Sequence, residues 1–253
     1  MNGVLAVRTI VGDLFSCVGF FTRIPVFGPM ERRLADAIWA APLVGIVVGL
    51  AGALAFAVSA ALGLPPAISA ILAIATTMLI TGCLHEDGLS DVADGFGGGV
   101  TRQRKLEIMK DSRIGAYGVI ALVVTVLLRW QALIAIADTG SVLLALLASH
   151  AASRSIIPAF MMLVPPARDT GLSATAGAIR AGAARTALLA GAASLLLLGI
   201  GPAIVAAIVL TIWFIALKWL TERQIGGQTG DVLGCLQQGA EIAVLLVALS
   251  LDH

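Results

Sequence analysis

The sequence predicts an all-α protein: a polytopic transmembrane helical bundle of about seven spans, within a range of about six to eight. Hydrophobic residues make up 59% of the 253 residues, charged residues make up 12%, and the mean hydropathy is +1.00. Because soluble domains carry about 25% charged residues, a water-soluble globule of this size would leave too much apolar surface in water. The apolar stretches run for about twenty residues without two-residue alternation, which favours membrane helices over a β-barrel. A net charge of +1 gives no reason to expect a nucleic-acid partner.

Seven stretches have the length and composition of membrane-spanning helices. A helix rises about 1.5 Å per residue, so about 20 residues cross the apolar layer of a bilayer. The fifth stretch is short and is expected to gain residues before Thr186. Residues 4–21 are either an eighth span or a partly buried helix that precedes the bundle. The seven predicted spans are residues 37–63, 67–84, 116–137, 141–163, 186–200, 202–220 and 232–251.

The connections between these spans alternate in charge. Three tight turns, at residues 63–66, 138–141 and 199–202, contain no Lys or Arg. The positive-inside rule therefore places the other connections in the cytoplasm and the C-terminus outside. No second soluble domain is indicated, so residues 1–253 are predicted to form a single integral-membrane domain. The four basic connections are residues 22–36, 85–115, 164–185 and 218–231.

The connection of residues 85–115 is also rich in acids. If it continues as a helix beyond Leu84, then Asp87, Asp91 and Asp94 fall at positions i, i+4 and i+7 and share one face. Bare carboxylates on one face repel each other, and a bound cation removes that repulsion. Because all the ligand atoms would be oxygens, the spacing predicts a site for Mg²⁺ or Ca²⁺ rather than for a softer metal.

A glycine run and a basic cluster follow these acids. The run Gly97–Gly99 is expected to open a flexible turn with free backbone N–H groups, and Thr101 is expected to cap the next helix. Basic residues between Arg102 and Arg113 lie just beyond. Acids, glycines and bases together predict a metal–diphosphate site at the membrane surface. The alternative is a solvated cytoplasmic loop whose charges only fix the topology.

Polar residues elsewhere are candidates for the same site. Arg154 shares a face of the fourth span with His150, and it either contacts a phosphate or carboxylate or extends to the nearer surface. Arg129 lies toward the outer end of its span and is expected to extend to the membrane surface. Asp231 stands at a helix start, where capping and a catalytic role are equally open. His85 is expected to be a hydrogen-bonding neighbour of the acids rather than a metal ligand.

Long motifs in this chain resemble those of the cobalamin synthase family, the adenosylcobinamide-GDP ribazoletransferases. The strongest matches are the runs LHEDGLSDVADGFGGG, from Leu84 to Gly99, and EIMKDSRIGAYG, from Glu107 to Gly118. The resemblance covers the chain from end to end. Its supporting matches are Phe21–Val26, Pro42–Gly45, His150–Arg154, Pro166–Arg168 and Thr229–Gly234.

The chain departs from the family pattern in two places. Cys83 stands where a second glycine is expected after Gly82. Gln237 and Gln238 occupy a stretch where a carboxylate is expected, which leaves Glu241 as the acid of that stretch and puts its role in doubt.

The resemblance implies a multi-pass enzyme of the bacterial inner membrane with one catalytic domain and small-molecule substrates. It implies that adenosylcobinamide-GDP is joined to α-ribazole or to α-ribazole 5′-phosphate, with release of GMP. The product is then adenosylcobalamin or its 5′-phosphate, and the implied cofactor is Mg²⁺. Beside the lipid bilayer, a homo-oligomer and contacts with enzymes of the same pathway stay open as partners.

These observations give each candidate residue a predicted role. Asp87, Asp91 and Asp94 are predicted metal ligands. Glu86 and Asp231 are candidates for the base that takes the proton of the attacking ribose hydroxyl, and these five acids form the predicted catalytic set. The predicted substrate-binding residues are Gly97, Gly98, Lys110, Arg113, Arg154 and Arg168.

Two other functions compete with this one. A CDP-alcohol phosphotransferase or a prenyltransferase uses similar aspartates. The CDP-alcohol pattern needs Ala-Arg soon after its first Asp-Gly, whereas Asp87-Gly88 is followed here by Leu-Ser-Asp. A transporter would use the carboxylates for a coupling ion, normally near the bilayer midplane and between internal repeats. The predicted surface position of the acids and the lack of a visible repeat disfavour that class.

Overall fold

The part of the chain that the structure describes is built from helices. The computed structural model describes residues 2–26, 33–168 and 177–249, and every named element within them is a helix. The β pairing recorded in these ranges is one isolated parallel bridge between Pro166 and Gln228. The predicted all-α fold class is therefore confirmed.

Six helical segments within the described ranges are long and apolar enough to cross a membrane, which agrees with the predicted number. The first span joins α2 (Leu34–Ala37), the 3₁₀ turn η1 (Ile38–Ala40) and α3 (Ala41–Ala61). The chain is thus a multi-pass membrane protein. The other five spans are α7 (Ala116–Ile136), α8 (Thr139–Ser155) with α9 (Ile157–Leu163), α11 (Ala181–Leu195) with η2 (Leu196–Leu198), α12 (Ile200–Ile225) and α13 (Gly230–Leu249).

The second predicted span is interrupted by a sharp bend. Helix α4 (Pro66–Thr81) qualifies as a span only together with α5 (Leu84–Gly98), which meets it at 89°. The bend lies at Gly82 and Cys83, whose φ angles of 64° and 56° are left-handed and cannot continue an α-helix. The acidic segment is helical, as the spacing argument required, but it does not continue the axis of the preceding span. Instead, α5 packs against α7 and α13.

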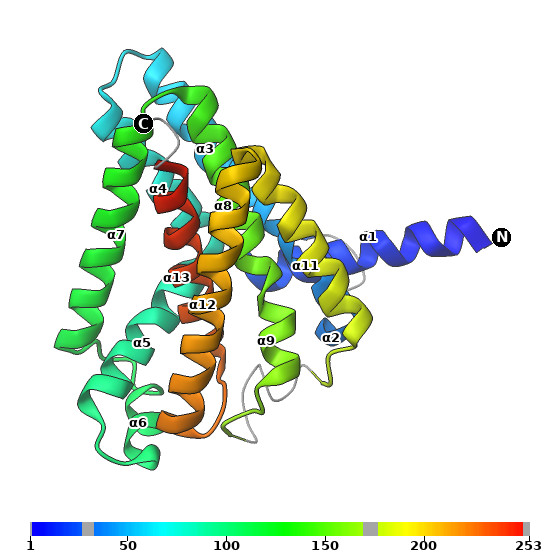
Figure 1. Cartoon of the computed structure of the whole chain (residues 1–253), viewed down its shortest axis with the longest axis vertical. Helices are drawn as coiled ribbons and strands as arrows, with labels where there is room; N and C mark the ends of the chain where they lie inside the picture. Colours follow the sequence, from blue (N-terminus) through cyan, green and yellow to red (C-terminus); the bar gives the residue numbers. More distant parts are fainter. Residues whose placement is uncertain (1, 27–32, 169–176, 250–253) are drawn as a thin grey trace.

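The ends of the helices preserve the charge pattern of the sequence. The three turns without Lys or Arg lie at one end of the bundle (Figure 1). The segments around residues 99–115, 164–168 and 226–229 lie at the other end (Figure 1). As expected, α11 begins before Thr186, whereas α12 runs past its predicted end at residue 220 and carries Lys218 and Arg223 on the helix.

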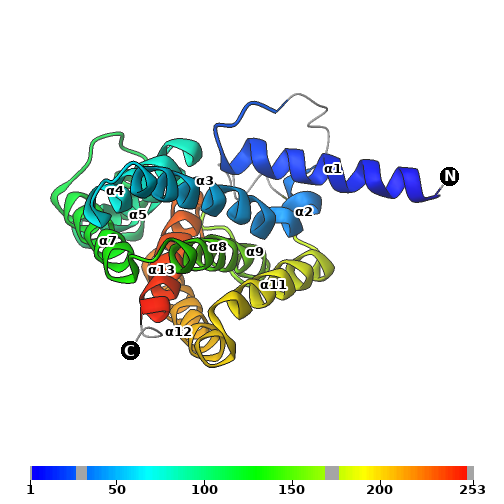
Figure 2. The ribbon, with the colours of Figure 1, turned by 90° about the horizontal axis from the view of Figure 1, so that it is seen from above.

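Helix α1 (Asn2–Phe21) lies across the bundle rather than along it. Its N-terminal end points away from the other helices, while its C-terminal end packs beside α2 and α3 (Figures 1 and 2). Within the part whose side chains the structure describes, α1 has an apolar stretch at Thr9–Phe21. Because Cys17 and Phe21 are buried, the structure favours the partly buried helix over the eighth span.

The centre of the bundle is the span formed by α8 and α9. Its buried share is 83%, compared with 22% for α7, which leaves much of α7 free to face lipid. Helix α3 packs closely on α8 because Gly49 has no side chain: an added Cβ would lie 2.6 Å from the Leu146 carbonyl oxygen. Small residues commonly allow such close helix contacts in membranes.

Candidate active site

The acidic helix α5 is held close to the start of α13. A Cβ on Gly88 would lie 2.7 Å from the backbone oxygen of Asp231, so only glycine permits this approach. Asp87 and Asp91 flank this contact on α5. The packing therefore brings acids that are about 140 residues apart in sequence into one region, as the shared-site prediction for Asp231 required.

Three acids and one arginine surround Asp91. Its acidic neighbours are Asp87, Asp94 and Asp231, and Arg168 is a cation in the same group. Arg168 donates to Asp231 at 2.8 Å, and the Thr229 hydroxyl lies 3.1 Å from the same carboxylate. The bridge between Pro166 and Gln228 ties the two segments that carry these residues. Predicted residues from three separate motifs thus form one cluster with excess negative charge.

Asp94 differs from the other acids because its carboxylate is already engaged. Its oxygens accept hydrogen bonds from the backbone N–H groups of Gly115, at 2.7 Å, and Gly118, at 2.9 Å. These donors belong to the N-terminus of α7, where a carboxylate is favoured by the free N–H groups and the helix dipole. Asp94 therefore fastens α5 to α7, and its metal role stays a prediction.

The cluster suits a hard cation that shares its coordination with a substrate. Among the described residues, no three His, Cys, Asp or Glu side chains already converge as a metal-binding group. Mg²⁺ usually retains water and binds through one or two carboxylates plus substrate phosphates, so a closed protein cage is not required. Asp87 and Asp91 provide such carboxylates beside a third acid, Asp231.

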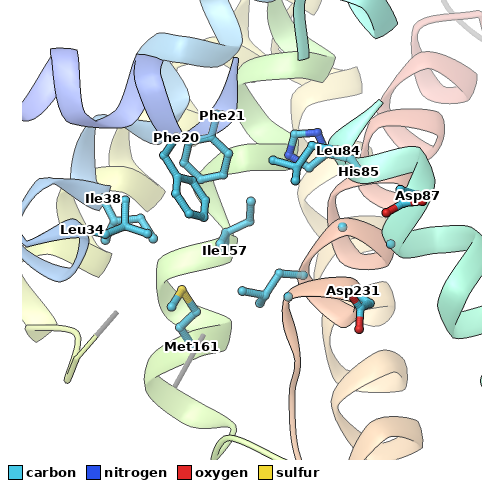
Figure 3. A pocket seen from close by; sticks show the side chains of 14 residues that line it. Phe20, Phe21, Leu34, Ile38, Leu84, His85, Asp87, Ile157, Met161 and Asp231 are labelled. Carbon is cyan, nitrogen blue, oxygen red and sulfur yellow. The ribbon is translucent and has the colours of Figure 1, made fainter. Parts of the chain in front are cut away.

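Two cavities meet at Asp87. The first, which we call the apolar cavity, has a volume of about 230 Å³ and lies between the end of α1, α9 and the starts of α5 and α13 (Figure 3). Asp87 and Asp231 stand on one side of it, and Phe20, Ile38 and Met161 stand on the other (Figure 3).

The second, which we call the charged cavity, has a volume of about 440 Å³. Its lining includes two predicted substrate-binding residues, Lys110 and Arg113, and the four acids Glu86, Asp87, Asp91 and Asp111. Arg113 donates to Asp111 at 2.6 Å, and these hydrogen bonds lower the pKa of Asp111 to about 2. The pair is therefore ionised at neutral pH. A phosphate that binds Arg113 has to share it with Asp111.

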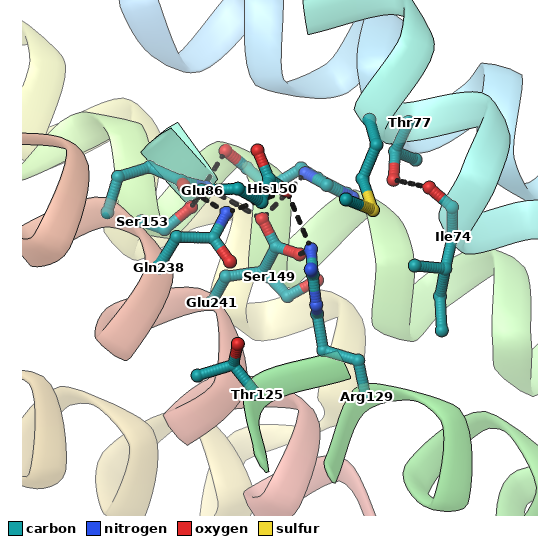
Figure 4. A network of polar contacts seen from close by, with 12 residues as sticks. Ile74, Thr77, Glu86, Thr125, Arg129, Ser149, His150, Ser153, Gln238 and Glu241 are labelled. Atoms are coloured by element: carbon teal, nitrogen blue, oxygen red, sulfur yellow. Dashed lines mark hydrogen bonds and ion pairs between the residues drawn. The ribbon is translucent and has the colours of Figure 1, made fainter. Parts of the chain in front are cut away.

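A network of buried charges connects α5 with α7, α8 and α13 (Figure 4). Arg129 on α7 donates to Glu86 on α5, at 3.1 Å, and to Glu241 on α13, at 3.3 Å. His150 on α8 contacts the other oxygen of Glu241 at 3.1 Å. All four side chains are nearly inaccessible. Since a buried charge is stable only when paired, this network joins four helices through one set of ion pairs.

The two glutamines that depart from the family pattern belong to this network. Gln237 donates to Glu241 at 2.7 Å and to the Ser153 hydroxyl at 3.0 Å. Gln238 donates to Glu86 at 3.2 Å. Neither glutamine is solvent-exposed. The stretch that contains Gln237, Gln238 and Glu241 therefore contacts α5 through Glu86.

The prediction that Arg129 extends to the membrane surface is wrong. Only 2% of the residue is exposed, because Glu86 and Glu241 supply its partners inside the bundle. An arginine inside a membrane span is costly unless it is paired, so its presence in the sequence already indicated partners inside the bundle. Arg154 also stays inside, where it donates to the backbone oxygen of His150, and it lines neither cavity at Asp87.

Two local predictions around α5 need correction. Gly97 and Gly98 are the last residues of α5 rather than part of a flexible turn. The Tyr117 ring packs where a side chain on Gly97 would stand. His85 was expected to hydrogen-bond the acids, but it stacks on Phe21 instead. Its Nε2 atom has no hydrogen-bond partner among the described residues. The cap is confirmed: Thr101 accepts from the Arg104 backbone N–H at the start of α6 (Arg102–Ile108).

Comparison with known proteins identifies the family. A protein of Mesorhizobium japonicum named adenosylcobinamide-GDP ribazoletransferase is 54% identical over 249 residues, covering 98% of this chain and 96% of that protein. A protein of Bradyrhizobium diazoefficiens with the same name is 52% identical over 250 residues, covering 97% and 96%. No solved structure shows a match. The family model described as cobalamin-5-phosphate synthase matches residues 13–249, and the chain therefore belongs to the cobalamin-5-phosphate synthase family.

Proposed function

We propose that this chain joins adenosylcobinamide-GDP to α-ribazole, or to its 5′-phosphate, and releases GMP. The relatives' names supply the reaction, and one observation in the structure supports it. Asp87, Asp91 and Asp231 come together from two helices at the point where the charged cavity and the apolar cavity meet. That arrangement offers one compartment to a charged diphosphate and another to an apolar base.

The reaction is a displacement at phosphorus. A ribose hydroxyl of α-ribazole forms a bond to the cobinamide-side phosphorus, the bond to the oxygen of GMP breaks, and the hydroxyl proton is lost. Lys110 and Arg113 line the charged cavity, where they would neutralise diphosphate charge together with the metal ion that its acids would hold. Arg168 adds a third cation beside Asp231.

Asp231 is the better of the two predicted bases. It lines the apolar cavity and stands at its rim with Asp87. Both carboxylates are ion-paired, Glu86 with Arg129 and Asp231 with Arg168, but the side chain of Asp231 is 22% exposed whereas that of Glu86 is 6% exposed, so Asp231 is the one that a substrate hydroxyl can reach. We assign the proton of the ribose hydroxyl to Asp231.

Asp87 and Asp91 are the proposed ligands of Mg²⁺, with Asp94 as a neighbour that fixes the position of α5. When bound, the ion would polarise phosphoryl oxygens and stabilise the charge of the leaving phosphate.

The proposed location is the bacterial inner membrane, with the site on the cytoplasmic face. The end of the bundle near α6 carries the basic connections, and positive charge near span ends favours the cytoplasm. Both substrates are cytoplasmic metabolites in this proposal. A homo-oligomer or docked pathway enzymes would add to the site without changing its chemistry.

The test uses the purified full-length protein in lipid nanodiscs with adenosylcobinamide-GDP, α-ribazole and Mg²⁺. We expect one GMP per joined corrinoid product, no product after EDTA treatment, and recovery when Mg²⁺ is restored. GMP release that does not depend on α-ribazole would contradict the transfer. Product formed equally well in EDTA would contradict the metal. A parallel reaction with a CDP-activated alcohol distinguishes the competing phosphotransferase.

A further inference from the structure

Helix α6 contacts one of the two segments that bring Arg168 and Asp231 together. Arg102, the first residue of α6, donates from Nη2 to the backbone oxygen of Ala167 at 3.0 Å. Ala167 is buried and directly precedes Arg168 in the chain. Arg102 therefore holds the peptide next to a cation of the candidate site, although the two arginines are far apart in sequence.

The guanidinium group of Arg102 also packs against the end of α12, beside which α6 lies (Figure 1). An added Cβ on Gly226 would lie 2.9 Å from Arg102 Cζ and 3.0 Å from Nη1. Gly226 ends α12 with a left-handed φ of 77°. The last carbonyl oxygens of a helix lack donors within the helix, so this end attracts a cation. Arg102 thus contacts both Ala167 and Gly226.

The segments that Arg102 contacts are joined to each other beside the site. The N–H group of Ala167 donates to the backbone oxygen of Gln228 at 2.8 Å. Arg168 follows on one segment and Asp231 on the other, and their side chains meet at 2.8 Å. The contacts of Arg102 therefore lie on the outer side of the same bridge whose continuation carries the ion pair.

The other end of α6 is anchored on the acidic helix α5. Met109, which follows α6, is buried, and an added Cβ on Gly95 of α5 would lie 2.5 Å from its Cγ atom. Lys105, in the middle of α6, contacts Gln224 of α12. Because α6 is only seven residues long and is held at both ends, Arg102 has a fixed position relative to α5.

Resting on the function proposed above, we infer that Arg102 is a positioning residue for Arg168. It holds the Ala167 peptide, and this fixes the backbone from which the Arg168 side chain reaches Asp231 and the diphosphate of adenosylcobinamide-GDP. Arg102 itself does not touch the substrate. A binding group that is displaced by about 1 Å can lose much of its effect, so the loss of this contact should weaken the work of Arg168.

The test compares Arg102→Gln with Arg104→Gln. Both substitutions remove one positive charge from α6, but Arg104 pairs with Glu107 on the same helix, at 3.3 Å. We expect Arg102→Gln to raise the KM for adenosylcobinamide-GDP about tenfold and to keep the KM for α-ribazole within about twofold. Arg104→Gln is expected to leave both KM values unchanged. Equal effects of the two substitutions on the KM for adenosylcobinamide-GDP would overturn the inference.

Rescue by a conservative variant separates the hydrogen bond from the charge. Arg102→Lys keeps the charge and one donor but loses the planar group that packs on Gly226. We expect its KM for adenosylcobinamide-GDP to rise about threefold, between the values of wild type and Arg102→Gln. A KM as high as that of Arg102→Gln, in a protein with a wild-type melting temperature, would contradict the contact with Ala167.

A double-mutant cycle distinguishes positioning from direct contact and from a general effect on the fold. In protein that already carries Arg168→Gln, the added substitution Arg102→Gln is expected to raise the KM by less than about twofold, because the side chain that it positions is gone. A further tenfold rise would mean that Arg102 acts independently of Arg168, which overturns the inference.

The failure of this inference can be distinguished from the failure of the proposed function. If wild-type protein forms no product from adenosylcobinamide-GDP and α-ribazole, the proposed function fails and the role of Arg102 falls with it. If wild-type protein is active and the two effects multiply in the cycle, only the role of Arg102 fails.

Discussion

Asp91 and Asp94 lie less than one helical turn apart, yet their carboxylates have different surroundings. Asp91 is half-buried among acids, with Arg168 as its nearby cation. Asp94 accepts two backbone hydrogen bonds from the start of α7. The same substitution at the two positions should therefore affect chemistry and folding in different proportions.

Asp91→Asn is expected to abolish most of the turnover without lowering stability. The amide keeps the size of the side chain and removes one of several repelling charges. Loss of a preorganised charged group typically costs about a hundredfold in rate or more. Mg²⁺-dependent GMP release and the melting temperature of the purified protein are the two measurements. Glu107→Gln, an acid on the exposed helix α6, is the matched control. Near-normal GMP release by Asp91→Asn would remove the proposed metal role of Asp91.

Asp94→Asn is expected to lose activity and stability together. An asparagine retains one acceptor oxygen, so one of the N–H groups of Gly115 and Gly118 faces an amide NH₂ instead. An unpaired donor at this position lowers the free energy of unfolding by about 1–3 kcal/mol. Thermal unfolding in the same nanodiscs checks this, with Asp91→Asn as the comparison. Equal melting temperatures for the two variants would mean that the hydrogen bonds from Gly115 and Gly118 to Asp94 do not stabilise the protein.

At the scale of elements, the position of α5 depends on the buried ion pairs that Arg129 makes with Glu86 and Glu241. Arg129 links Glu86 on α5 to Glu241 on α13, and the acids of the candidate site are carried by the same two helices. The network therefore sets the spacing between the helices that carry Asp87 and Asp231.

Arg129→Met is expected to destabilise the protein by about 3–5 kcal/mol, because two buried carboxylates lose their cation. The combined variant Arg129→Met, Glu86→Gln removes the cation together with one of its carboxylates and keeps Glu241 as the partner of His150 and Arg154, and it is expected to recover part of that loss. Arg113→Met, which breaks an exposed ion pair, is the control and should melt like wild type. A combined variant that is no more stable than Arg129→Met would contradict the electrostatic explanation.

Some of these elements can be predicted from the sequence and others cannot, for physical reasons. Helix positions follow from apolar length, and the turns at Gly63 and Gly199 follow from residues that accept a positive φ. The bend between α4 and α5 was missed because its second residue is Cys83, which rarely adopts a left-handed conformation.

The candidate site shows the same division. The acids on α5 were visible from their helical spacing, because spacing is a local property. The partners of Arg129 were not, because Glu241 lies 112 residues away and only packing brings it near.

At the scale of the whole molecule, the structure has two chemically different ends. The turns near Gly63 and Gly199 are free of Lys and Arg, whereas the end near α6 carries basic residues (Figure 1). The charge rule predicts that the α6 end faces the cytoplasm.

Cysteine labelling tests this orientation in cells. In a background where Cys17, Cys83 and Cys235 are replaced, Leu64→Cys and Gln103→Cys place one thiol at each end. A membrane-impermeant maleimide applied to cells with a permeable outer membrane is expected to label Leu64→Cys readily. Gln103→Cys should react only after the inner membrane is disrupted. The reverse pattern would invert the orientation and leave the site chemistry untouched.

The position of Asp87 between the two cavities has a stereochemical consequence. Because the two cavities share Asp87 and otherwise have different linings, donor and acceptor can occupy the protein at the same time, and no covalent enzyme intermediate is needed. A single in-line displacement then inverts the configuration at the transferred phosphorus. A donor with one chiral thiophosphate should give a product of opposite handedness, whereas retention would reveal two successive displacements.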